Sequence, residues 1–205
     1  MADHPVADAQ NPDSSAQRAF VAVVSGLPRS GTSMMMQLLA AGGIPPLTDE
    51  QRTADDDNPR GYFELESVKQ IDKDASFLDG APGHAVKLIH ALITKLPERH
   101  PYRVVFMRRP IDEVLASQAK MLARTGKKGA SLPPEKLRVI FEKQVTDTLA
   151  ALAKRDDVEL LEVDYPSVIA DPPKAVDALN AFLGGDLDRD AMLAVIDPEL
   201  YRNKA

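Results

Sequence analysis

The sequence contains no cysteine and no tryptophan, and only 5% of its 205 residues are aromatic. The absence of cysteine excludes a disulfide framework, a cysteine-ligated zinc site and a thiol nucleophile, and it fits a reducing compartment. The scarcity of aromatic side chains gives no sign of a flat pocket for steroids or phenols. No apolar run approaches the roughly 18 residues that a membrane helix needs, so we expect no membrane span.

Positive charge is also scarce, because 25 Lys and Arg stand against 31 Asp and Glu, for a formal net charge of −6. Such a chain is a poor candidate for general nucleic-acid binding, which relies on a basic face. Residues 1–18 show neither structural periodicity nor the basic and apolar regions of a signal peptide. We therefore expect a disordered tail over 1–18, a single domain over 19–205 and a cytoplasmic location.

Short apolar runs alternate with helical patterns along the rest of the chain. Residues 20–25 (FVAVVS) are almost wholly apolar and rich in β-branched side chains, which is typical of a buried parallel strand. Further strands are predicted at 84–89, 102–107 and 158–163, and helices near 34–41, 64–78, 112–124, 133–155, 172–183 and 188–195. This alternation predicts an α/β protein in three layers (α/β/α), with a central parallel sheet between two layers of helices.

Residues 26–33 (GLPRSGTS) follow the first predicted strand and have the length of a phosphate-binding P-loop. Backbone N–H groups in such a turn, together with the N-terminus of the next helix, form a cradle for an anion. The ATPase version needs a lysine directly after its second glycine, and this position is Thr32. No lysine occurs before Lys69, so the cation of this loop is Arg29.

The segment Pro-Arg-Ser-Gly-Thr-Ser at 28–33 resembles the 5′-phosphosulfate loop of sulfotransferases that use 3′-phosphoadenylyl sulfate (PAPS), which reads Pro-Lys/Arg-Ser-Gly-Thr-Thr/Ser. The resemblance extends from about Phe20 to the C-terminus and includes the segment at 162–184. It implies a P-loop fold, PAPS as the sulfate donor and adenosine 3′,5′-bisphosphate as the spent product. The loop residues that it assigns to donor binding are Arg29, Ser30, Gly31, Thr32 and Ser33.

The resemblance also implies a second anion site, because PAPS carries a separate 3′-phosphate. The family holds this phosphate with an arginine at the end of a strand and a serine eight residues later, and Arg109 and Ser117 have this spacing. Many relatives carry proline two residues after the arginine, which here would select Arg108 and lengthen the spacing to nine. We prefer Arg109, because the residues of the helix then align without a gap.

Sulfuryl transfer needs a cation at the leaving-group oxygen and a base for the acceptor proton. Arg29 is the expected cation. Cytosolic members of the family carry Lys and His two residues apart at the end of a strand, whereas Lys87 and His90 are three apart, so only one of them matches in register. Glu64 is a third candidate, since other sulfotransferase branches use a glutamate base. The sequence leaves the choice among Lys87, His90 and Glu64 open.

An acidic run over 49–57 has the composition of a metal site but lacks the glycine and the closing glutamate of a calcium loop. Sulfotransferases of this type need no metal, so we expect a solvated loop and no metal ligands.

The predicted function is transfer of a sulfuryl group from PAPS to a hydroxyl or an amine of an unidentified small molecule or glycan. The chain is short for the family, so acceptor-binding segments are either missing or supplied by a partner chain, for example in a homo-oligomer. Two alternatives stay open. One is a P-loop small-molecule kinase, which needs a lysine reaching the loop from elsewhere and an acidic Mg²⁺ ligand. The other is a non-catalytic nucleotide-binding module.

Overall fold

A four-stranded parallel sheet forms the centre of the protein. The computed structural model describes residues 18–49, 63–126, 129 and 132–197. The strands lie in the order β2 (Ala85–Lys87), β1 (Val21–Gly26), β3 (Tyr102–Arg108) and β4 (Val158–Asp164), and every pairing is parallel. The predicted fold class is confirmed.

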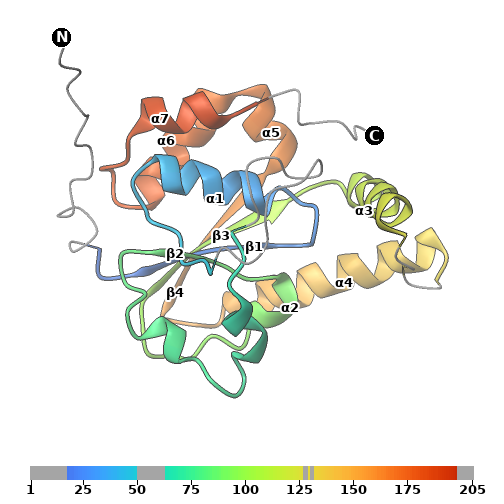
Figure 1. Ribbon diagram of the computed structural model, residues 1–205, viewed down its shortest axis with the longest axis horizontal. Helices are drawn as coiled ribbons and strands as arrows, with labels where there is room; N and C mark the ends of the chain where they lie inside the picture. Colours follow the sequence, from blue (N-terminus) through green and yellow to red (C-terminus); the bar gives the residue numbers. More distant parts are fainter. Residues whose placement is uncertain (1–17, 50–62, 127–128, 130–131, 198–205) are drawn as a thin grey trace, which may run out of the picture.

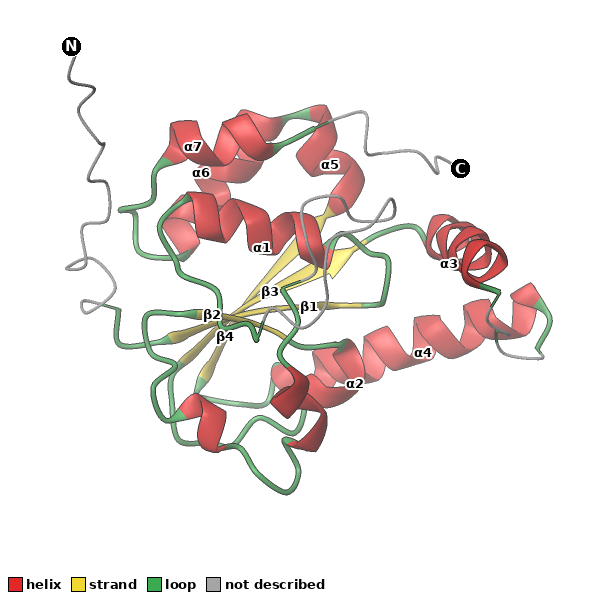
Figure 2. Ribbon diagram, in the orientation of Figure 1, coloured by secondary structure: helices red, strands yellow, loops and turns green. Residues whose placement is uncertain are grey.

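Helices cover both faces of the sheet (Figures 1 and 2). One face carries α1 (Thr32–Ala41), α5 (Tyr165–Ala170), α6 (Pro172–Phe182) and α7 (Arg189–Val195). The other carries α2 (His90–Ile93) and α4 (Pro134–Leu152), with two short 3-10 helices at 66–70 and 76–78. Helix α3 (Ile111–Thr125) lies beyond the ends of the strands and packs on α4.

Strand β1 is buried on both faces, which explains its continuous apolar sequence. Because side chains alternate along a strand, Val21 and Val23 join the core under α4, whereas Ala22 and Val24 join the core under α1 and α6. Full burial of each valine stabilises the fold by about 1.5–3 kcal/mol. Since all four strands run in parallel, their carboxyl ends lie along one edge of the sheet.

The predicted helix over 64–78 is wrong. The structure has two short 3-10 helices there, Glu66–Gln70 and Ser76–Leu78. Between them the Asp74 carboxylate accepts a hydrogen bond from the Ser76 backbone N–H at 2.9 Å. Such a local bond offers the backbone an alternative to the helical ladder. Val68, Ile71 and Leu78 are still buried. The apolar spacing therefore identified core positions correctly, although it predicted one continuous helix in place of two short 3-10 helices.

Helix α5 was not predicted, although its N-terminus has a clear signal. The Asp164 carboxylate accepts a hydrogen bond from the Ser167 backbone N–H at 3.1 Å, and Pro166 stands in the first turn. Both features favour a helix start. This cap places Tyr165 at the carboxyl end of β4, beside the phosphate loop.

Two further observations concern the predicted tail and the membrane. Residues 1–17 lie outside the described residues, and the side chain of Arg18 is 5% exposed and forms an ion pair with Asp186 at 2.7 Å. Among the described residues, none of the helices is both long enough and apolar enough to cross a bilayer.

Candidate functional site

The phosphate loop connects β1 to α1 at the carboxyl edge of the sheet. Gly26, Arg29 and Gly31 have φ angles of 149°, 75° and 101°. A Cβ on Gly26 would lie 2.5 Å from Ser30 Oγ and 2.7 Å from the Met107 carbonyl oxygen, and a Cβ on Gly31 would overlap the ring of Tyr165. The two glycines are therefore needed both for backbone conformation and for close packing.

Helix α1 begins directly after this turn. The first intrahelical bond runs from the Met35 N–H to the Gly31 carbonyl at 3.1 Å, so the N–H groups of the first turn have no carbonyl partner within the helix. Gly31 supplies no side chain to cap them. Thr32 and Ser33 add hydroxyl groups at the same end. The arrangement can receive an anion at the helix N-terminus.

Arg29 turns toward α3. Its Nε donates a hydrogen bond to Ser117 Oγ at 3.0 Å, and Ser117 is buried. The Gln118 amide donates to the Pro28 carbonyl at 3.3 Å, which adds a second contact between α3 and the loop. Two residues that the family resemblance assigns to different phosphates thus touch each other.

Arg109 lies on the same side of the loop. Its Nη1 donates to the Arg29 carbonyl oxygen at 3.1 Å, and its Nε donates to Glu113 Oε2 at 2.9 Å. The side chains of Arg109 and Glu113 are only 7% and 4% exposed. The guanidinium carbon lies 4.8 Å from the centre of the Tyr165 ring. Burial raises the pKa of the Tyr165 hydroxyl, although the positive charge of Arg109 opposes this shift.

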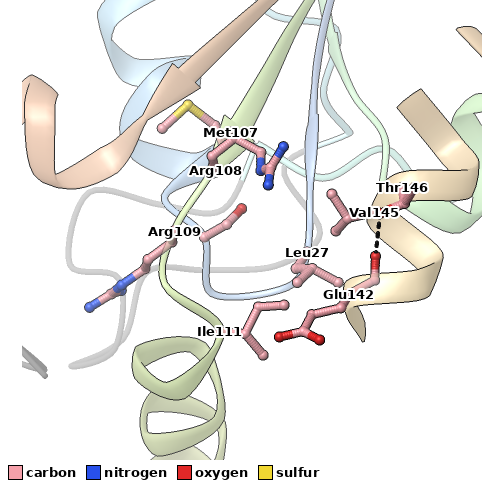
Figure 3. A pocket seen from close by; sticks show the side chains of 9 residues that line it. Leu27, Met107, Arg108, Arg109, Ile111, Glu142, Val145 and Thr146 are labelled. Atoms are coloured by element: carbon pink, nitrogen blue, oxygen red, sulfur yellow. Dashed lines mark hydrogen bonds between the residues drawn. The ribbon is translucent and has the colours of Figure 1, made fainter. Parts of the chain in front are cut away.

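Arg108 and Arg109 point to different sides of the end of β3 (Figure 3). Arg108 forms an ion pair with Glu162 of β4 at 2.5 Å, and its side chain is 46% exposed. Arg109, in contrast, is buried against the phosphate loop. The geometry therefore joins Arg109, rather than Arg108, to Arg29, which in turn bonds Ser117.

Glu113 and Tyr165 lie in the site but were not predicted from the sequence. Glu113 stands four residues after Arg109, which is the spacing of an ion pair within a helix, so a signal was present. Tyr165 belongs to the segment at 162–184, to which the resemblance assigned no site residue. No sequence pattern places its ring against Gly31, because this contact depends on the order of the strands.

Lys87 and Glu64 meet at the other side of the loop. Lys87 ends β2, and its Nζ lies 3.4 Å from Ser33 Oγ and 3.6 Å from Glu64 Oε1. The Lys87 side chain is 10% exposed and that of Glu64 is 41% exposed. The Thr48 hydroxyl donates to the Glu64 carbonyl at 3.0 Å and holds this residue in place. Two of the three candidate bases are thus neighbours beside the phosphate loop.

His90, the third candidate, begins α2 on the side of the sheet that α4 covers. It is 7% exposed, and its Nε2 forms a hydrogen bond with Gln144 Oε1 of α4 at 3.1 Å. This contact between α2 and α4 gives His90 a packing role in the helical layer.

A small pocket lies between the loop and α4 (Figure 3). Its volume is about 110 Å³, and its lining includes Leu27, Ser30, Ile111 and Val145. Small-molecule sites usually measure about 300–1,000 Å³, so this pocket is too small for a nucleotide. The described residues contain no group of three or more His, Asp or Glu side chains that could hold a metal ion. Residues 50–57 of the acidic run lie outside the described residues.

Comparison with solved structures found similar folds among sulfotransferases. The sulfotransferase domain of the olefin synthase from Synechococcus PCC 7002 has a TM-score of 0.58 at 17% identity, over 96% of this chain and 91% of that domain. A sulfotransferase from Mycobacterium tuberculosis has a TM-score of 0.56 at 17% identity, over 94% of this chain and 78% of that one.

Retinol dehydratase, solved with androsterone and the inactive cofactor PAP, has a TM-score of 0.53 at 17% identity, over 90% of this chain and 65% of that one. At such identities the likeness shows a shared fold. Comparisons of the sequence with protein families and with curated proteins found no match.

Proposed function

We propose that this chain is a PAPS-dependent sulfotransferase, which transfers a sulfuryl group from PAPS to a hydroxyl or an amine of a small molecule or glycan. The proposal depends on one observation: a P-loop without the ATPase lysine lies in direct contact with a second cationic site, through the hydrogen bond from Arg29 to Ser117 and the bond from Arg109 to the Arg29 carbonyl. PAPS carries two separate anionic groups, which this pair of sites matches. The fold shared with sulfotransferases supports the proposal.

The donor would bind along the carboxyl edge of the sheet. The N–H groups at the start of α1 and the hydroxyls of Thr32 and Ser33 receive the 5′-phosphosulfate. Arg109 and Ser117 hold the 3′-phosphate, and a charge-assisted hydrogen bond to such a phosphate contributes about 1.5–3 kcal/mol. Arg29, which bonds Ser117 and belongs to the loop, would contact the donor between these two groups.

In the reaction, the bond between sulfur and the bridging oxygen of the donor breaks while a bond from sulfur to the acceptor oxygen or nitrogen forms. Negative charge therefore grows on the bridging oxygen, which leaves on the 5′-phosphate of adenosine 3′,5′-bisphosphate. We assign Lys87 to this charge beside Arg29, because its ammonium lies 3.4 Å from Ser33 Oγ at the start of α1. The Arg29 side chain is hydrogen-bonded to Ser117 on one side of the loop. Lys87 therefore adds a second positive charge on the opposite side.

The acceptor proton needs a base, and the geometry favours Glu64. Its carboxylate is 41% exposed, so an acceptor can reach it, and it lies 3.6 Å from Lys87 Nζ. Lys87 as a cation is itself no proton acceptor. His90 is only 7% exposed and packs against Gln144 of α4, so an acceptor reaches it less easily than it reaches Glu64. A positioned base contributes typically 10²–10⁴-fold to the rate.

Calorimetry with adenosine 3′,5′-bisphosphate and with Mg-ATP tests the proposed donor. We expect micromolar binding of the bisphosphate, lost in Arg29→Ala, and weaker binding of Mg-ATP. Mg-ATP is the informative competitor, because Lys87 approaches the loop from elsewhere and so meets one of the two requirements of a kinase. Tighter binding of Mg-ATP would overturn the proposal in favour of phosphoryl transfer.

Transfer of labelled sulfate from PAPS into a pool of metabolites and glycans tests catalysis, and mass spectrometry of the products identifies the acceptor. Binding of the bisphosphate without transfer to any acceptor would indicate a non-catalytic module. The cytoplasmic location and a homo-oligomeric state stay predictions from the sequence.

A further inference from the structure

Helix α3 presents two buried polar side chains to the phosphate loop, one turn apart. Glu113 is 4% exposed and accepts a hydrogen bond from Arg109, and Ser117 is 2% exposed and accepts one from Arg29. One face of α3 therefore holds both arginines of the candidate donor site. Ser117 already has a role in the proposed function, whereas Glu113 has none.

Glu113 is a hydrogen-bond partner of the Arg109 guanidinium. Its Oε2 lies 2.9 Å from Arg109 Nε, while Arg109 Nη1 reaches the Arg29 carbonyl at 3.1 Å. The guanidinium is planar, so bonds at two of its nitrogens fix its plane. The Tyr165 ring, whose centre is 4.8 Å from the guanidinium carbon, supports the group as well.

The charge of Glu113 does not explain its presence at a phosphate site. A carboxylate repels a phosphate, and in a buried setting this repulsion is only weakly screened. A contribution of Glu113 to donor binding is therefore indirect, and Arg109 is the residue of the candidate donor site that it contacts. A buried arginine also needs a partner, since an isolated buried charge is strongly unfavourable.

We propose that Glu113 is a positioning residue, which does not touch the donor and instead aligns Arg109 for the 3′-phosphate. This inference rests on the proposed function. The proposed role depends on the length of the Glu113 side chain, because the carboxylate must extend far enough along α3 to meet Arg109 Nε. The same contact, through Arg109, supports the loop carbonyl at Arg29, where the backbone has a φ of 75°.

Two matched variants separate reach from charge. Glu113→Asp keeps the charge but withdraws the carboxylate by roughly 1.5 Å, about one C–C bond. Glu113→Gln keeps the length and an acceptor oxygen but loses the charge. The readout is the ratio of the dissociation constants of adenosine 5′-phosphate and adenosine 3′,5′-bisphosphate, because partial unfolding weakens both ligands alike and leaves the ratio unchanged.

We expect the preference for the bisphosphate to fall roughly tenfold in Glu113→Asp, equivalent to about 1.4 kcal/mol, and to stay within about threefold in Glu113→Gln. Retention of the full preference in Glu113→Asp would overturn the inference, whether or not Glu113→Gln retains it. Thermal unfolding of both variants checks that they are folded at the assay temperature.

A double-mutant cycle with Arg109→Lys gives a second test. Lysine lacks the forked guanidinium, so the Glu113 carboxylate no longer has a planar group to align in this variant. In this background Glu113→Asp should change the preference less than about twofold. An undiminished tenfold effect without Arg109 would contradict a role through this arginine.

The two proposals fail in different ways. Absence of any preference for the bisphosphate in the unmodified protein would refute the proposed donor site itself. A clear preference in the unmodified protein that survives Glu113→Asp would refute only the role of Glu113.

Discussion

Arg29 Nε donates a hydrogen bond to Ser117 Oγ at 3.0 Å, although 88 positions separate the two residues in the sequence. The bond joins the phosphate loop after β1 to the helix after β3. Parallel pairing of β1 with β3 makes this contact available, because it brings Gly26 opposite Met107 at the carboxyl ends of the two strands. The two candidate phosphate subsites are therefore parts of one continuous site.

Ser117→Ala tests this link. Without the hydroxyl, Arg29 loses a partner and the 3′-phosphate loses a donor, so we expect adenosine 3′,5′-bisphosphate to bind about 10- to 100-fold more weakly, the range for a hydrogen bond to a charged group. Calorimetry measures the change. Thr125→Ala removes a hydroxyl from the exposed end of the same helix and should leave binding unchanged. Equal affinity in the two variants would contradict a role for Ser117.

Gly31→Ala tests the packing of the loop, and Gly43→Ala is its matched control. Both glycines have positive φ, 101° and 94°, but only a Cβ on Gly31 would overlap Tyr165, while Gly43 faces open space. The left-handed conformation alone costs about 1–2 kcal/mol in either variant, and overpacking adds about 1–3 kcal/mol at Gly31. Urea unfolding compares the free energies of unfolding. Equal losses of unfolding free energy in the two variants would mean that the Tyr165 ring moves aside without cost.

Arg109→Lys and Arg108→Lys decide which arginine serves the 3′-phosphate. Lysine keeps the charge but cannot make the two directed bonds of Arg109 to Glu113 and the Arg29 carbonyl. We expect Arg109→Lys to weaken bisphosphate binding about tenfold or more, at the level of a charge-assisted hydrogen bond. Arg108→Lys alters only an exposed pair with Glu162 and should change affinity less than about twofold. The reverse ranking would select Arg108.

Glu64→Gln and His90→Gln distinguish the candidate bases. Once an acceptor is known, Glu64→Gln should lower kcat by about 10²–10⁴-fold, the usual contribution of a general base, while bisphosphate affinity stays unchanged. His90→Gln should affect mainly stability, because His90 is buried and bonded to Gln144. A large loss of kcat in His90→Gln at full folding would instead identify the histidine as the base.

We expect the free energy of unfolding to fall in alkaline solution because of Tyr102. Burial raises the pKa of this residue from 10.0 to about 12, and its hydroxyl donates to the Pro97 carbonyl at 2.8 Å. The folded protein favours the protonated form, so this contribution to stability is complete below pH 10 and is lost as the pH rises toward 12. Urea unfolding across this range measures the slope. Tyr102→Phe should make the slope shallower, and an unchanged slope would assign it to other groups.

Several features of the site could be predicted from the sequence because they depend on residues that are adjacent in the chain. The glycines at 26 and 31 and the apolar strand before them predict a phosphate loop, and its backbone conformation follows from local sterics. The α/β alternation predicts the parallel sheet. The helix expected over 64–78 failed for an equally local reason, since the Asp74 carboxylate binds the Ser76 N–H where a helical bond would otherwise form.

The sequence by itself predicted the sheet and the phosphate loop with Arg29, because periodicity and turn chemistry are properties of short segments. The resemblance to sulfotransferases then selected Lys87, Arg109 and Ser117 as candidates. Only the tertiary structure decided that Arg109 rather than Arg108 is buried against the loop, that Lys87 meets Glu64 and that His90 packs on α4. These outcomes depend on which strands are adjacent in the sheet and on which face the segment after each strand lies. Such contacts join residues that are far apart in sequence, so no local pattern encodes them.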